Sequence, residues 1–191
     1  HLGTPFYRPI IEAAARNDLT LIIHPGGKEG TIVGTPALAG IGPRFHGEYE
    51  CLICQVAAVN IASAVYDGLF VEFPNLRLAF AAFGFDWVGP AMWRMDAEWR
   101  AMRIDVPWVA QAPSKYIAQN VRIIVSETDA LPEGALAEIT AMIPPSSILF
   151  GSNTPFDSDL SWVDTLPEAL REQVCHGNAV ESFRRLEAIA A

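Results

Sequence analysis

The sequence predicts an α/β fold in which helices cover a parallel sheet. Short apolar runs alternate with helical patterns along the whole chain, and no linker divides it, so we expect one domain over residues 1–191. Apolar strands that alternate with helices are typical of parallel sheets. Four strand–helix units are present, whereas a (β/α)8 or TIM barrel needs eight units and about 250 residues. The chain therefore corresponds to about half of such a barrel.

The first helix is predicted over residues 5–16, where it begins near Pro5 and ends before Asn17 and Asp18. Residues 19–24, Leu-Thr-Leu-Ile-Ile-His, form a short apolar run that is typical of a buried strand. Pro25 and the two glycines after it end this strand, and a loop rich in Gly and Pro continues to about residue 47.

A long helix is predicted over residues 48–69, and it is apolar on most faces. Gln55 and Asn60 interrupt the apolar stretch and Asp67 ends it, so it falls short of the about 20 apolar residues that a membrane span requires. A helix that is apolar all round is buried on more than one side. It is therefore a core helix, or it lies between the barrel wall and a second subunit.

The same alternation predicts the rest of the chain. The predicted strands span residues 76–82, 121–126 and 147–151, and the predicted helices span residues 87–102, 133–142 and 178–189. An open doubly wound sheet is the alternative architecture, but no Gly-x-Gly-x-x-Gly motif opens any of these helices. The barrel half is therefore the favoured reading.

The composition limits the class of protein. With 51% hydrophobic and 18% charged residues, the chain is too apolar for disorder. The net charge of −9 argues against nucleic acid and membrane surfaces as partners. Three cysteines make no disulfide framework, and residues 1–5 do not resemble a signal peptide, so we expect a cytoplasmic protein. Cys51 and Cys54, one helical turn apart, are expected to be packing residues.

The residue at the end of the first strand is a candidate for chemistry. Ligands of parallel α/β proteins bind at the carboxyl ends of the strands, and His24 stands there, before Pro25. An imidazole at this place suits a metal ligand or a general base, and equally a histidine that is hydrogen-bonded at the barrel rim.

Several motifs follow one another along the chain, at residues 5–10, 22–27, 68–77, 87, 92–96, 149–155 and 176–179. Taken together and in this order, they resemble the amidohydrolase-related family, which includes aminocarboxymuconate semialdehyde decarboxylase and the hydroxybenzoate-type decarboxylases. The resemblance implies a (β/α)8 barrel of the metal-dependent hydrolase type. It implies one divalent metal, zinc or manganese, held by a His-x-His pair on the first strand, a middle-strand His and a last-strand Asp.

Carried onto this chain, the resemblance assigns His24 to the middle-strand metal ligand. Asn153 stands at the place of the last-strand Asp, and Phe156 at the place of the histidine that follows it. The segment that would carry the His-x-His pair is absent from residues 1–191. Phe83, Trp87, Asn153 and Phe156 are the residues expected to line the substrate site.

These departures weaken the expected metal site. A catalytic zinc site has about three protein ligands, and an Asn carbonyl at residue 153 supplies no charge. Two further acids, Asp86 and Asp157, follow the second and fourth strands and could restore a carboxylate in the barrel mouth. Either acid could equally be a solvated or capping residue.

Two functions remain at this point. The first is a hydrolase or decarboxylase that acts on a small carboxylated or cyclic substrate, with His24 as metal ligand or general base and Asp86 or Asp157 as acid. The second is a catalytically degenerate relative that binds a ligand or a partner subunit. Because a barrel half exposes two sheet edges, we expect a homodimer or a complex with another subunit, with the apolar helix at residues 48–69 as the contact.

Overall fold

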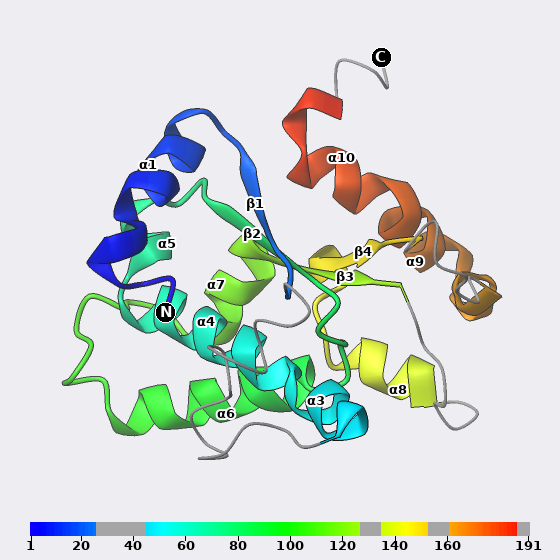
Figure 1. Ribbon diagram of the computed structural model, residues 1–191, viewed down its shortest axis with the longest axis horizontal. Helices are drawn as coiled ribbons and strands as arrows, with labels where there is room; N and C mark the ends of the chain where they lie inside the picture. The colour runs from blue at the N-terminus through cyan, green and yellow to red at the C-terminus, as the bar shows by residue number, and fades with distance from the viewer. Residues whose placement is uncertain (26–44, 127–134, 153–160, 187–191) are drawn as a thin grey trace.

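The structure is a computed structural model, and it describes residues 1–25, 45–126, 135–152 and 161–186 (Figure 1). Its centre is a parallel sheet of four strands in the order β1-β2-β3-β4. The strands are β1 (Thr20–Ile23), β2 (Arg77–Ala81), β3 (Val121–Val125) and β4 (Ile148–Phe150). Each lies inside a predicted range, so the parallel α/β architecture is confirmed, and it corresponds to part of a barrel.

The pairing register sorts the strand side chains onto two faces. One face carries Leu21, Leu78 and Val121, and then Ile23, Phe80 and Ile123, and these side chains belong to or pack against the hydrophobic core with the helices. The opposite face, which we call the inner face, carries the alternate residues Thr20, Ile22, Ala79, Arg122, Ile124 and Leu149. In a closed barrel the inner face would line the interior.

Helices and short helical turns connect the strands. They are η1 (Pro5–Tyr7), α1 (Arg8–Arg16), α3 (His46–Leu52), α4 (Cys54–Tyr66), α5 (Leu69–Glu72), α6 (Val88–Ala101), α7 (Pro113–Asn120), α8 (Ala135–Ala141), η3 (Pro145–Ser147), η4 (Ser161–Thr165), α9 (Glu168–Glu172), the π-helical η5 (Gln173–Gly177), α10 (Asn178–Ser182) and η6 (Arg184–Leu186). The helices predicted over residues 5–16 and 87–102 are confirmed, as is the helix predicted over 133–142 within its described part, which is α8.

Two predictions about helices need correction, and one helix was missed. The helix expected at 48–69 ends at Tyr66, because Gly68 has a left-handed backbone (φ +78°) and α5 begins after it. The last helical segment begins at Glu168 rather than at residue 178, and α10 ends at Ser182. Helix α7 was not predicted at all. Its start is stabilised by Asp96, whose carboxylate accepts hydrogen bonds from the backbone N–H and the hydroxyl of Ser114, both at 2.8 Å.

The apolar helix is covered on several sides by the rest of this chain. Ile53 keeps a helical backbone, so α3 and α4 run on from His46 to Tyr66, and every residue of α4 is buried or half-buried. Asn60 and Ser63 accept hydrogen bonds from the backbone N–H groups of Leu2 and Gly3, both at 3.0 Å. The polar residues that interrupt the helix therefore dock the N-terminal segment.

By length and composition alone, the helix His46–Tyr66 could cross a membrane. It has 21 residues with a mean hydropathy of 1.3, and 28% of its most apolar stretch is buried. The apolar stretch was expected to fall short of a membrane span, whereas this helix meets the length and hydropathy of one. Core helices of soluble proteins meet the same criteria, so this is weak support for a span, and the expectation of no membrane partner stays a prediction.

The last helical segment closes the amino end of the sheet, where α10 lies beside the start of β1 (Figure 1). The hydroxyl of Thr20 donates to the carbonyl of Ser182, and the Ser182 hydroxyl accepts from Arg122 Nε at 2.8 Å. Asp18 pairs with Arg184 at 2.8 Å and with Arg77 at 3.4 Å. These contacts tie α10 and η6 to three strands.

Arg122 is the largest polar side chain in the interior, with 2% of its surface exposed. Besides Ser182, its Nη1 donates to the carbonyls of Ala118 and Gln119, both at 3.3 Å, and of Val121 at 3.0 Å. Burial lowers the pKa of the Arg122 guanidinium, and the carboxylate of Glu181 opposes that shift. Fixed acceptors therefore compensate a buried charge at the amino end of the sheet.

Replacing Arg122 with methionine is expected to lower the free energy of unfolding by about 3 kcal/mol, because buried acceptors lose a charged donor. Chemical denaturation of both proteins measures the difference. The matched control is Arg94→Met, which removes an exposed pair with Glu98 (3.0 Å) and should cost less than about 0.5 kcal/mol. Equal losses of unfolding free energy in the two variants would show that the buried contacts of Arg122 stabilise the fold no more than the exposed pair of Arg94 does.

Replacing Gly89 with alanine is expected to destabilise the protein by about 1–3 kcal/mol, because the new Cβ would lie 2.7 Å from Met142 Cβ, where α6 meets the end of α8. In the control Gly47→Ala, no described atom lies within 4 Å of the new methyl group. That variant should be neutral or stabilising by up to about 1 kcal/mol, since alanine favours helix. Thermal melts of both variants measure the change in stability. A Gly47→Ala variant that is less stable than Gly89→Ala would contradict the prediction.

Candidate functional site

The carboxyl ends of the four strands form one edge of the sheet, because all strands run in the same direction. His24 follows β1 at this edge and is exposed, with its Nδ1 at 2.6 Å from the carbonyl oxygen of Pro25. Ser126 follows β3, and Gly151 and Ser152 follow β4. The predicted position of His24 at the open end of the sheet is confirmed, whereas its role as ligand or base stays a prediction.

Gly151 and Ser126 lie side by side at this edge. A Cβ on Gly151 would lie 2.6 Å from Cγ2 of Ile124 and 3.9 Å from Cβ of Ser126, so only glycine fits there without a shift. Ile124 lies on the inner face, so this part of the edge has an apolar side chain close to the hydroxyl of Ser126. Neither residue was predicted to have a role, although a glycine directly after a short strand signals a close approach of this kind.

The loop from β2 to α6 turns its aromatic residues into the helix layer. Ala82 (φ +61°) and Gly84 (φ +69°) have left-handed backbones, and Phe83 between them is 3% exposed. The Phe83 ring packs edge-on against Phe80 with a centroid distance of 6.0 Å. The indole N–H of Trp87 donates to the carbonyls of Phe83 at 2.9 Å and of Gly84 at 3.2 Å. Both aromatic residues therefore stabilise the loop.

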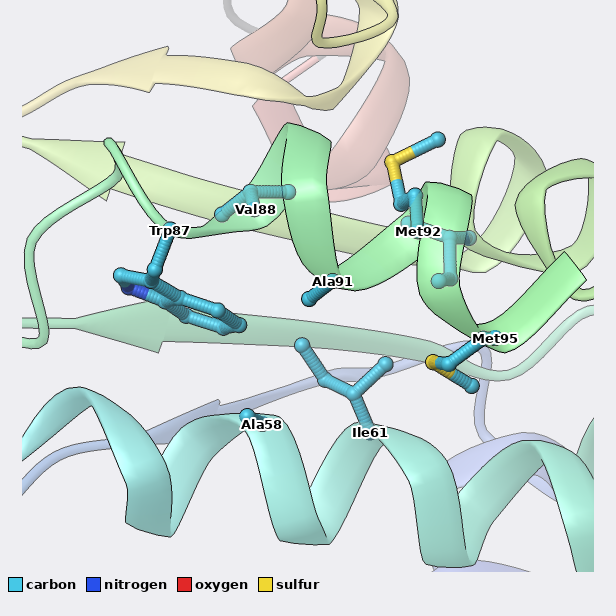
Figure 2. A pocket seen from close by; sticks show the side chains of 8 residues that line it. Ala58, Ile61, Trp87, Val88, Ala91, Met92 and Met95 are labelled. Carbon is cyan, nitrogen blue, oxygen red and sulfur yellow. The ribbon is translucent and has the colours of Figure 1, made fainter. Parts of the chain in front are cut away.

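The Trp87 ring lines a small apolar cavity between α4 and α6, where it lies near Ala58, Ala91 and Ile61 (Figure 2). The cavity volume is about 10 Å³, which is room for no more than one water molecule, and its walls offer that water no polar partner. It is a packing gap rather than a ligand site. The assignment of Phe83 and Trp87 to substrate binding stays a prediction, and their described contacts are packing contacts.

Asp86 is exposed near the end of the same loop. Burial raises the pKa of the Cys54 thiol, and the negative charge of Asp86 raises it further, so this carboxylate lies within electrostatic reach of the first turn of α4. Among the described contacts, no hydrogen bond or ion pair joins Asp86 to His24. The expected role of Asp86 as an acid beside His24 stays a prediction.

A metal ion needs several donors that converge. Across residues 1–25, 45–126, 135–152 and 161–186, no group of three His, Cys, Asp or Glu side chains is placed to hold one. The candidates Asn153, Phe156 and Asp157 lie outside the described residues. The described residues alone therefore do not fit the metal that the resemblance implies, and His24 is the one predicted ligand among them.

Comparison with known proteins gives a family for this arrangement. A family model described as amidohydrolase matches residues 1–185. A search of the curated proteins finds no match.

Solved structures share the fold at low sequence identity. A 5-carboxyvanillate decarboxylase from Sphingomonas paucimobilis is 21% identical, with a TM-score of 0.68 over 96% of this chain and 55% of the other. An amidohydrolase from Mycobacterium avium subsp. paratuberculosis K-10 is 20% identical, with a TM-score of 0.72 over 95% and 46%. A dihydroxybenzoic acid decarboxylase from Polaromonas sp. JS666, with bound manganese and 2-nitroresorcinol, is 22% identical, with a TM-score of 0.67 over 98% and 56%.

The chain thus spans about half the length of the solved structures that it matches. The identities are low enough that these structures support the fold alone. The family match covers nearly all of the sequence and agrees with the parallel sheet and its open carboxyl edge. This chain belongs to the amidohydrolase family.

Proposed function

We propose that the chain forms part of an amidohydrolase-type enzyme that decarboxylates or hydrolyses a small carboxylated substrate. The observation that carries the proposal is His24, an exposed imidazole at the carboxyl end of an edge strand, in a chain whose family match covers residues 1–185. Two solved decarboxylases with the same fold, named for 5-carboxyvanillate and dihydroxybenzoic acid, support decarboxylation of an aromatic acid as the first reaction to test.

In this proposal His24 is the residue of this chain that touches the reacting group, as a metal ligand or as a general base. Its Nδ1 lies 2.6 Å from the Pro25 carbonyl, so a proton on Nδ1 would be held there and would leave Nε2 free of a proton for a metal or a substrate. The manganese in two of the solved decarboxylases supports manganese as the metal, and zinc is the other metal that the resemblance implies. Asn153 and Asp157 remain the proposed additional contacts.

A degenerate relative that binds a ligand or a partner subunit without turnover is the second candidate. It is favoured by one observation, which is that the described residues bring no three metal-ligating side chains together. An Asn at residue 153, where the resemblance implies an acid, points the same way. In both candidates we expect a small-molecule ligand and a cytoplasmic protein.

The test measures metal content and carbon dioxide release from 2,6-dihydroxybenzoate and 5-carboxyvanillate, before and after addition of manganese or zinc. The enzyme proposal expects turnover that falls at least about a hundredfold in His24→Ala, as for loss of a general base or a metal ligand. The matched control is His46→Ala, because His46 is also an exposed histidine but lies on α3, where it pairs with Glu50 at 3.2 Å.

Turnover that His24→Ala leaves unchanged would exclude His24 from the reaction. Absence of turnover and of metal, together with binding of either aromatic acid that His24→Ala weakens, would support the degenerate relative. Loss of activity in both histidine variants would show a general loss of fold, and circular dichroism would identify it.

A further inference from the structure

Ser126 and Gly151 continue the pairing of β3 with β4 beyond the ends of both strands. The backbone N–H of Gly151 donates to the carbonyl of Val125 at 2.9 Å. A Cβ on Gly151 would lie close to the side chains of both Ile124 and Ser126. The side chains of Ile124 and Ser126 therefore point to the same side of the sheet, which is the inner face.

His24 shares this face at the same end of the sheet. Continued by one residue past the end of β1, the register sets His24 beside Ala81, whose partner on β3 is Ile124. Neighbouring strands lie about 4.8 Å apart, so two strand spacings separate the backbones of His24 and Ile124 by about 10 Å. The imidazole and the Ser126 hydroxyl thus flank one space, with the small side chain of Ala81 between them.

This space lies where the inner face opens toward the carboxyl ends of the strands. Ala79 and Arg122 are buried. The next residues of the same face along β2 and β3, Ala81 and Ile124, are half-buried, and so is Ser126 beyond them. A molecule that enters at the carboxyl end, where parallel α/β proteins bind their ligands, can therefore contact Ile124 and Ser126.

The chemistry of the space suits a flat ring that carries neutral oxygen groups. Ile124 offers the ring an apolar contact, and Gly151 has no side chain to fill the room beside it. Within the residues that the structure describes, the Ser126 hydroxyl makes no hydrogen bond, so it is available as a donor.

The charges at this edge favour a ring hydroxyl over a second carboxylate as the partner of Ser126. Residues 24–25, 81–86, 126 and 151–152, which are the described residues of the edge, include no Lys or Arg, and Asp86 adds a negative charge. A carboxylate that leaves water needs an opposite charge, whereas a neutral hydroxyl needs only a hydrogen-bond partner.

We propose that Ser126 binds a ring hydroxyl of an aromatic acid whose carboxyl group lies toward His24, and that it thereby selects acids with a hydroxyl on each side of the carboxyl group. The inference rests on the proposed function, in which His24 touches the reacting group. It adds a residue that selects the substrate and that the motifs of the family resemblance do not include.

Calorimetric binding of two acids tests the proposal. The first acid, 2,6-dihydroxybenzoate, has two ring hydroxyls, and the second, 2-hydroxybenzoate, has one. Both are titrated into the purified protein in a buffer that contains manganese, and the ratio of their dissociation constants measures the preference for the second hydroxyl. Ser126→Ala should lower this ratio about fivefold, which is the loss expected for one hydrogen bond between neutral groups.

Two further serine variants make the comparison specific. Ser126→Thr keeps a hydroxyl and should keep the preference for 2,6-dihydroxybenzoate. Ser146→Ala is the matched control, because Ser146 is also half-buried but lies at the amino end of the sheet, where it donates to the carbonyl of Ala118 at 3.2 Å. It should leave the ratio unchanged, and circular dichroism of each variant shows that the fold is kept.

Three results would overturn the proposal. A ratio that Ser126→Ala leaves unchanged shows that Ser126 does not meet the second hydroxyl, while binding of both acids keeps the proposed function in place. Equal weakening of both acids in Ser126→Ala shows that the hydroxyl does not select between ring substituents. Unaltered protein that binds neither acid contradicts the proposed function and this inference together.

Discussion

The parallel direction of four short strands is the constraint on which the rest of the structure depends. Parallel neighbours cannot be joined by a tight turn, so each connection crosses back over the sheet and carries helices with it. The residues Leu21, Phe80 and Ile123 are buried by those helices on one face. On the inner face, Ala79 and Leu149 are also buried, whereas Ile22 on the edge strand β1 is 56% exposed.

The same constraint separates the two ends of the strands, which differ in chemistry. At the amino end, the contacts of Arg122, Asp18 and Ser182 hold α10 and η6 against the sheet. The polar groups of these residues therefore make structural contacts. At the carboxyl end, His24 stays exposed. The network of polar contacts and the candidate for chemistry thus lie at opposite ends of the sheet.

Much of the fold could be predicted because its strands are continuous apolar runs and its strongest helices have clear ends. Helix α7 escaped prediction because it is short and amphipathic, and its start depends on Asp96 from another helix, which no local pattern shows. The early end of α4 depends on one left-handed glycine, Gly68, against which Trp108 packs. Phe83 and Trp87 make packing contacts in a loop where Ala82 has a left-handed backbone, and the substrate role expected of them stays a prediction.

By itself the sequence determined the α/β class, the four strands, the family and the place of His24 after the first strand, because apolar period, turn residues and motif order are local signals. Only the tertiary structure decided that Arg122 is buried and paired with α10, that Phe83 is in the core and that Ile22 is left open on an edge strand. The burial and pairing of these residues depend on which residues from distant segments come into contact, and on the few residues whose backbone is left-handed. Neither is encoded within a short window of sequence.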